Sequence, residues 1–245
     1  MKYRILTLLN VLSLSILFLP ETSPATELIT FYFSGTSKTA SQALGALPSG
    51  AYTVNQQYQM NGSAVDTSFT DLNTGSSATA SLRTDGPKYN GYADAPALLH
   101  DYGSSSKTVV DSSKITFTGL EKNTTYTLYV YSQGFNDATH NFITNVDVKT
   151  TGSFARLGTL TTTDLNSYVI NQNYLVDTVS TGSDGKLVIS FYTNTGSGFN
   201  RGAINAVQLV YGGVAVVPEP ASVALLGVGG VLLAYRSKRE LQESV

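Results

Sequence analysis

Apolar and polar residues alternate with a period of two along several short stretches between residues 26 and 213. The clearest stretches read "ITFTGL", "YTLYVYS" and "KLVISFYT", and a later one reads "AINAVQLVY". This alternation is typical of β-strands that bury one face. It predicts that Tyr126, Leu128 and Val130 share one face of their strand, with Tyr129 and Tyr131 on the other. The pattern therefore indicates an all-β protein.

Other apolar stretches predict further strands near residues 28–34, 51–58, 142–149, 155–162 and 168–179. Between the predicted strands, runs such as "DLNTGSSA", "DYGSSSK" and "STGSDGK" are rich in Gly, Ser, Asn and Asp, which indicates turns. The same region has no helical pattern of useful length and no fixed internal repeat. Short strands joined by turns predict a single domain over residues 26–213, built as a two-sheet sandwich.

The start of the chain has the organisation of an export signal. Lys2 and Arg4 precede an apolar stretch, residues 5–19, that is short for a membrane span, and small residues follow at Ser23 and Ala25. This order of basic, apolar and small residues is typical of a secretory signal peptide. We expect residues 1–25 to be removed by cleavage after Ala25, and an uncleaved membrane anchor is the alternative.

A second apolar stretch lies near the C-terminus. Residues 221–235 contain no charged side chain, and Arg236, Lys238 and Arg239 follow at once. A helix of the protein core would show a polar face, and this stretch has none, so we expect a membrane helix. The basic cluster predicts that the end of this helix faces the cytoplasm, which leaves the body of the protein outside.

Pro218, Glu219 and Pro220 stand just before this apolar stretch, where the prolines hold the backbone extended. The triplet, the apolar helix and the basic cluster, in that order, resemble the PEP-CTERM sorting signal of Gram-negative bacteria. The resemblance covers residues 214–245. It implies recognition of Pro-Glu-Pro by exosortase, a membrane protease-transpeptidase of species that make abundant extracellular polysaccharide. It also implies a transient membrane anchor, followed by transfer to the outer surface or the extracellular matrix.

The segment "ITFTGLEKNTTYTLYVYS" carries a second resemblance. Its Leu-turn-Thr-x-Tyr pattern is similar to that of fibronectin type III domains, in which a tyrosine hydroxyl fixes a corner between strands. Taken with "ALLHDYGSSS" before it and "INAVQL" after it, the segment more closely resembles galactose-binding-like jelly rolls. This second resemblance implies that the sandwich is a jelly roll.

The composition limits which ligands the protein can bind and which reactions it can catalyse. The net charge is -2 and charged residues make up 13% of the chain, so no basic field is present to attract nucleic acid. Cysteine is absent, which excludes a thiolate metal site. The two histidines, His100 and His140, lack the spacing of metal ligands. His100 stands beside Asp101, but no motif places a third catalytic group, and we interpret both histidines as structural.

Two features of the sequence are compatible with ligand binding. Tyr129 and Tyr131, if exposed, would form an aromatic platform for sugar rings, and the alternative is that they are strand formers half-buried at a sheet surface. Loops such as "DLNTG" and "GSDGK" offer oxygen ligands for calcium. Turn chemistry explains these loops equally well, so we expect no cofactor, with calcium as the alternative.

The sequence thus predicts an exported, non-enzymatic surface protein of the envelope or matrix, with exosortase and extracellular polysaccharide as partners. The alternative is a secreted carbohydrate-active hydrolase on the same scaffold. A glycosidase needs two carboxylates at a defined separation. Asp94, Asp101, Asp137 and Asp147 are available, but their spacing singles out no pair.

Overall fold

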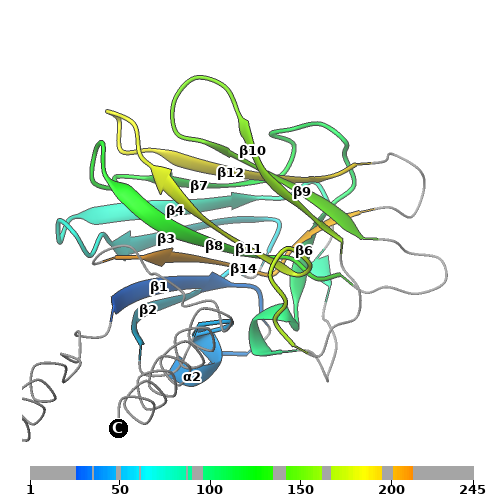
Figure 1. Cartoon of the computed structure of the whole chain (residues 1–245), viewed down its shortest axis with the longest axis horizontal. Coiled ribbons are helices and arrows are strands. Elements are labelled where there is room, and N and C mark those ends of the chain that lie inside the picture. Colours follow the sequence, from blue (N-terminus) through cyan, green and yellow to red (C-terminus); the bar gives the residue numbers. More distant parts are fainter. Residues whose placement is uncertain are drawn as a thin grey trace, which may run out of the picture. The chain divides into compact units, whose positions relative to one another are not determined.

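The computed structural model describes residues 26–34, 36–47, 51–60, 62–86, 88–89, 96–134, 142–161, 167–194 and 201–211. The predicted signal peptide, the sorting triplet, the apolar helix and the basic cluster lie outside these ranges. Nearly all regular structure within them is β-strand, as Figure 1 shows, so the predicted all-β class is confirmed. No helix in these ranges is long and apolar enough to cross a membrane.

Two main sheets form the sandwich. Sheet A has the strand order β11-β8-β14-β1-β2, and sheet B has the order β10-β9-β12-β7-β4-β3. The strands of sheet A are β1 (Thr26–Tyr32), β2 (Tyr52–Gln59), β8 (Thr125–Tyr131), β11 (Tyr174–Ser180) and β14 (Ala206–Val210). The strands of sheet B are β3 (Ala64–Thr70), β4 (Ser77–Arg83), β7 (Lys114–Thr118), β9 (Ile143–Lys149), β10 (Ala155–Thr161) and β12 (Leu187–Thr193).

A third, smaller sheet and two short helices complete the described elements. The small sheet has the order β13-β6-β5. Its strands are β5 (Lys88–Tyr89), β6 (Tyr102–Ser105) and β13 (Gly202–Ile204), and the helices are α2 (Ala40–Ala43) and the 3-10 helix η1 (Ala97–Leu99). From β7 onwards the chain crosses repeatedly between sheets A and B, which is the connectivity of a jelly roll.

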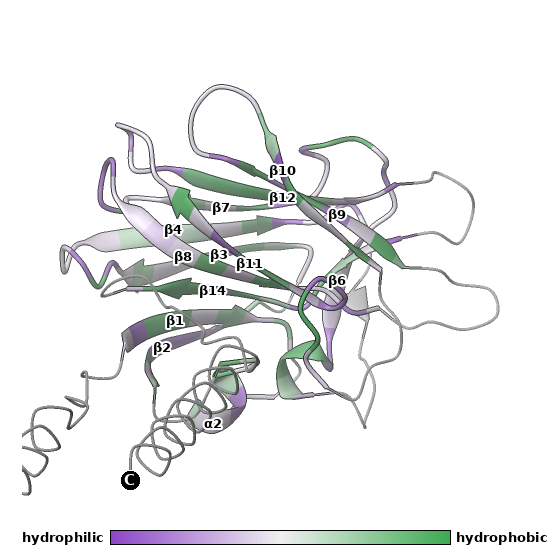
Figure 2. Cartoon of the chain, viewed as in Figure 1, coloured by the Kyte–Doolittle hydropathy of each residue, from purple (hydrophilic) through white to green (hydrophobic). Residues whose placement is uncertain are grey.

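The core lies between the two sheets and follows the predicted alternation. Tyr126, Leu128 and Val130 of β8 belong to one buried cluster, as do the apolar residues of β7, β12 and β14 that alternate with polar ones. Figure 2 shows this alternation along the strands of both layers. Phe31 lies at the centre, with ring centroids of Phe69 and Phe117 at 5.3 and 5.1 Å. Each such buried side chain contributes roughly 1.5–3 kcal/mol to folding.

Four strands, β3, β4, β5 and β6, were not predicted, and β6 contradicts a predicted turn. β3 and β4 carry mostly Ser, Thr and Ala. The buried side chains of β4 are Ala78, Ala80 and Leu82, and two of these three are small. β6 lies inside "DYGSSSK", a run that we expected to be a turn. Because β6 pairs with both β13 and β5, its small residues are buried in a sheet rather than exposed in a loop.

A tyrosine fixes the corner between β7 and β8. The Tyr126 hydroxyl donates a hydrogen bond to Asp71 Oδ2 at 3.0 Å and accepts one from the Glu121 N–H at 3.0 Å. The other carboxylate oxygen of Asp71 accepts the N–H groups of Asn73 and Thr74, so this side chain also closes the β3–β4 turn. Burial, followed by the charge of Asp71, raises the pKa of Tyr126 well above its ordinary value. The hydroxyl therefore stays protonated and keeps its donor role.

Candidate functional site

The outer face of sheet B carries a hollow of about 410 Å³. Its floor is a row across three neighbouring strands, because Val188 of β12 pairs with Thr116 of β7 on one side and with Lys149 of β9 on the other. Leu187 and Ile189, on either side of Val188, point into the core. The alternation that builds the core thus also directs Thr116, Val188 and Lys149 outwards.

Three lysines, from three separate strands or strand ends, lie in this floor or beside it. They are Lys114 on β7, Lys149 at the end of β9 and Lys186 just before β12, and we call the site the lysine hollow. Asp111, Asp184 and Phe154 stand among the other lining residues. With three lysines and two aspartates, the lining carries a net charge of +1.

The lysines differ in their partners. Lys114 Nζ lies 2.9 Å from Asp111 Oδ1 in an ion pair. Lys149 Nζ lies 5.5 Å from the centroid of the Phe154 ring, within reach of a cation–π contact. Among the described residues, Lys149 and Lys186 form no ion pair. These two ammonium groups are therefore available to an acidic ligand.

The rim of the hollow is held in place by local hydrogen bonds. Asp111 has a φ of 74°, in the left-handed region that Asp adopts more readily than most residues. Its N–H donates to Ser190 Oγ of β12 at 2.8 Å, which ties the loop before β7 to the neighbouring strand. On the opposite rim, Asp184 Oδ1 accepts the Lys186 N–H at 3.1 Å. Both aspartates thus have structural roles in the rim.

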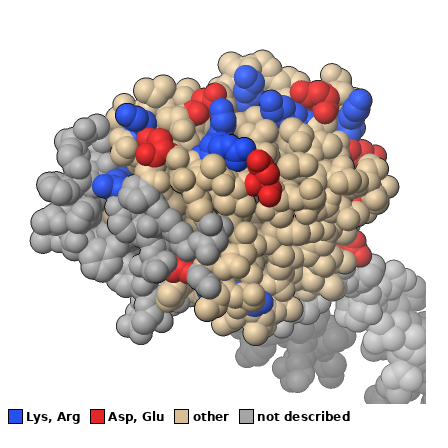
Figure 3. All heavy atoms as spheres, turned by 180° about the vertical axis from the view of Figure 1, so that it is seen from behind, with Lys and Arg blue, Asp and Glu red and all other residues tan. Residues whose placement is uncertain are grey.

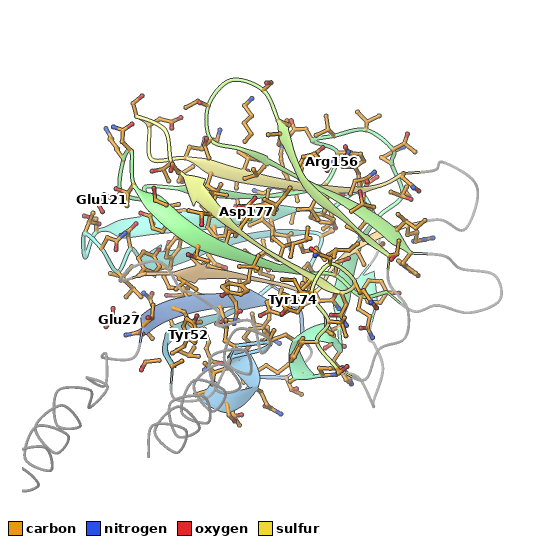
Figure 4. The ribbon with its side chains drawn as sticks, in the orientation of Figure 1. Glu27, Tyr52, Glu121, Arg156, Tyr174 and Asp177 are labelled. Carbon is orange, nitrogen blue, oxygen red and sulfur yellow. The ribbon has the colours of Figure 1, made fainter. Side chains whose placement is uncertain are left out.

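A network of polar side chains continues the same face beyond the hollow. The Asp147 carboxylate accepts hydrogen bonds from Arg156 Nε and, at 2.5 Å, from the Tyr192 hydroxyl. Arg156 also donates to Asn145 Oδ1 at 2.7 Å and to the Tyr192 hydroxyl at 2.6 Å. Burial, with the adjacent Asp147 carboxylate, raises the pKa of Tyr192. Arg156 projects from β10 in Figure 4. Because Arg156 and Tyr192 both engage the Asp147 carboxylate, this carboxylate is poorly suited to act as an acid, base or nucleophile in hydrolysis.

The charged side chains are unevenly distributed on the face drawn in Figure 3. On the face drawn in Figure 3, most Lys, Arg, Asp and Glu side chains gather along the upper part, and most of the remaining described surface carries no charge. A chain with only 13% charged residues therefore concentrates many of them in one region.

The structure corrects the predicted tyrosine platform. Tyr129 is 1% exposed and Tyr131 is fully buried, so neither ring is open to a sugar. The Tyr131 hydroxyl donates to Gln208 Oε1 at 2.6 Å and accepts the Ala46 N–H at 3.2 Å. Burial keeps the pKa of Tyr131 well above its ordinary value.

The burial of Tyr131 has a physical cause that the strand pattern did not reveal. The segment around α2 packs on the outer face of sheet A, where Thr30 Oγ1 donates to the Ala43 carbonyl at 2.9 Å. The ring of Tyr174, labelled in Figure 4, stacks on Tyr131 at 5.7 Å, and Tyr168 meets it edge-on at 5.6 Å. Tyr131 is thus an interior residue of a covered sheet.

His100 and Asp101 form a local pair. His100 Nδ1 lies 3.0 Å from Asp101 Oδ1, and the Asp101 side chain is buried. The carbonyl of Asp101 accepts a hydrogen bond from the buried side-chain amide of Asn205 at 3.0 Å. These contacts favour the structural interpretation of His100. His140, Asp94 and Asp137 lie outside the described residues.

The described ranges contain no group of three or more His, Asp or Glu side chains that could hold a metal ion. In the two loops considered for calcium, Asp71 binds backbone N–H groups and Tyr126, and Asp184 binds the Lys186 N–H. Calcium binding stays a prediction.

The fold and this face define a β-sandwich with a polar, charged hollow, and comparison with known proteins adds a sorting signal. Residues 216–239 match the PEP-CTERM protein-sorting motif. The chain therefore ends in a PEP-CTERM signal, which implies an exported protein that exosortase processes and that is sorted to the cell envelope. No curated protein matches the chain.

Several solved structures are similar to parts of the chain. A xanthan lyase from Paenibacillus is 22% identical over 62% of this chain and 13% of its own, with a TM-score of 0.34. An exo-β-1,3-galactanase from Phanerochaete chrysosporium is 16% identical over 66% of this chain and 31% of its own, with a TM-score of 0.31. The family 32 carbohydrate-binding module of C. perfringens NanJ, in complex with galactose, is 11% identical over 60% of this chain and 100% of its own, with a TM-score of 0.27. The chain thus spans less than a third of the two enzymes.

Proposed function

We propose that this protein is a non-enzymatic component of the envelope or extracellular matrix of a Gram-negative bacterium, and that its β-sandwich binds extracellular polysaccharide in the lysine hollow. Exosortase recognises Pro218-Glu219-Pro220 and releases the protein from a transient membrane anchor. The signal at residues 216–239 supports the sorting half of this proposal. The composition of the hollow supports the binding half.

The observation that carries the binding half is the combination of groups in one concave site. The half-buried ring of Phe154 offers an apolar surface for the face of a sugar ring. Thr116 and Ser183 bring hydroxyl groups, and Lys149 and Lys186 bring donors that can bind sugar oxygens. Binding sites for small polar ligands typically combine a concave apolar surface with a few directed polar groups.

The carboxylates around the hollow argue for binding rather than hydrolysis. Asp111 is paired with Lys114, and Asp184 accepts a backbone N–H of its own turn. Asp147 is held by Arg156 and Tyr192. A glycosidase needs one carboxyl group as an acid and a second as a base or nucleophile. Carboxylates engaged in ion pairs and turns are not poised for those roles.

A binding panel with a ring-removing variant tests the proposal. The full-length chain, purified in a mild non-ionic detergent, is titrated with a panel of neutral and acidic polysaccharides, with and without calcium. We expect saturable binding to at least one glycan, and Phe154→Ala should weaken it about tenfold, because stacking on an aromatic ring contributes roughly 1 kcal/mol or more.

The matched control is Ile170→Ala, which also removes a solvent-accessible apolar side chain, but from a loop outside the lysine hollow. This variant should bind like the wild type. Failure of every glycan to bind would overturn the binding half, and release of shortened sugar products would overturn the non-enzymatic assignment.

A further inference from the structure

We infer that the lysine hollow selects acidic polysaccharides, in which a sugar carboxylate recurs along the chain, over neutral ones. This inference rests on the proposed polysaccharide binding and specifies its ligand class. Three observations support the inference. The sheet register brings three lysines to one hollow, two of these lysines form no ion pair within the described part of the chain, and the lining as a whole has a net positive charge.

Sheet register brings the lysines together. Lys186 just before β12, and Val188 and Ser190 on it, stand two residues apart, so successive outward positions are about 7 Å apart. Lys149 pairs across from Val188, and Lys114 pairs across from Ser190. Long lysine stems allow ammonium groups at these positions to converge on an acidic group over the floor.

The available charge lies on two of the three lysines. Lys114 is engaged by Asp111 at 2.9 Å, whereas Lys149 and Lys186 form no ion pair within the described part of the chain. Lys149 is also positioned over the Phe154 ring, at 5.5 Å from its centroid. A sugar placed against the exposed part of this ring would bring a ring carboxylate close to that ammonium group.

The charge balance favours a sparsely charged polymer. The lining has a net charge of +1, and the chain as a whole has a net charge of -2. Asp111 and Asp184 would repel a polymer with closely spaced negative groups, such as a sulfated glycan or a nucleic acid. One carboxylate for each sugar unit or repeat matches the hollow better.

A comparison of one polymer in charged and neutral forms tests this inference. The full-length chain in mild detergent is titrated with polygalacturonate, with its methyl-esterified form and with dextran sulfate, at low and physiological salt. Lys149→Gln and Lys186→Gln are compared with Lys38→Gln, which removes one lysine from the segment before α2, on the side of sheet A. The folding of each variant is checked by thermal unfolding.

We expect polygalacturonate to bind more tightly than its ester and more weakly as salt rises. Each hollow variant should lose about fivefold in affinity, the scale of one exposed charge pair, and Lys38→Gln should lose none. Equal binding of acid and ester, or no effect of the hollow lysines, would overturn the selectivity while the proposed binding stands. Tighter, lysine-dependent binding of dextran sulfate would overturn the preference for sparse charge. Absence of binding to every glycan would overturn both proposals.

Discussion

At the scale of single residues, hydrogen bonding decides which tyrosines stabilise the sandwich. Tyr126 joins three segments, because its hydroxyl bonds to Asp71 after β3 and to the Glu121 N–H before β8. Tyr211 packs edge-on against Tyr126 at 5.2 Å, and its buried hydroxyl has no hydrogen-bond partner among the described residues. Two neighbouring tyrosines of the same core thus differ in what their hydroxyl groups contribute.

Replacing each tyrosine by phenylalanine should separate these contributions. Tyr126→Phe removes a hydrogen bond to a buried carboxylate, and we expect it to lower the free energy of unfolding by about 2 kcal/mol. Tyr211→Phe is the matched control and should leave stability unchanged or slightly higher, since it removes a buried polar atom that has no partner. Urea unfolding followed by tyrosine fluorescence measures both. Equal effects of the two substitutions would contradict the role assigned to the Tyr126 corner.

At the scale of elements, the alternation of apolar residues predicted the strands that build the core. β7, β8, β12 and β14 lie where the sequence placed them, with the predicted faces turned inwards. β3, β4 and β6 were missed because they are rich in Ser, Thr, Ala or Gly and contain few large apolar side chains, which makes them resemble turn sequences. A pattern within one strand also says nothing of what covers its outer face, which is why Tyr129 and Tyr131 were misjudged.

The lysine hollow was beyond prediction for a related reason. Lys114, Lys149 and Lys186 are far apart in the sequence, and no motif links them. They meet because β12 pairs with β7 on one edge and with β9 on the other. Strand order and register, which arise from packing across the whole sandwich, create the site.

The sorting segment can be tested as an element of its own. Replacing Pro218, Glu219 and Pro220 by alanine removes the triplet that we propose exosortase recognises. We expect the variant to accumulate unprocessed in the membrane fraction, detected by a size shift on immunoblots with an antibody to the sandwich. A variant with alanines at Gln242, Glu243 and Ser244, which follow the matched residues 216–239, is the control. Normal processing and surface arrival of the triple-alanine variant would contradict the assignment.

At the scale of the whole molecule, a C-terminal sorting signal follows a β-sandwich that carries a candidate binding site. The C-terminal signal implies sorting to the cell envelope, and the sandwich offers a concave, positively charged site on the outer face of sheet B. The proposed ligand, extracellular polysaccharide, would meet the protein at the envelope. We therefore expect glycan to bind in the lysine hollow.

Hydrogen–deuterium exchange of the full-length chain, with and without saturating polygalacturonate, tests this claim most directly. The two loops that border the hollow, residues 150–154 and 181–186, lie outside the strands, where local opening is easier than in the core. We predict that the ligand slows exchange in both loops and leaves the segment around α2 on sheet A unchanged. Unchanged exchange in both loops, with slowing confined to sheet A, would contradict the account and place the ligand elsewhere.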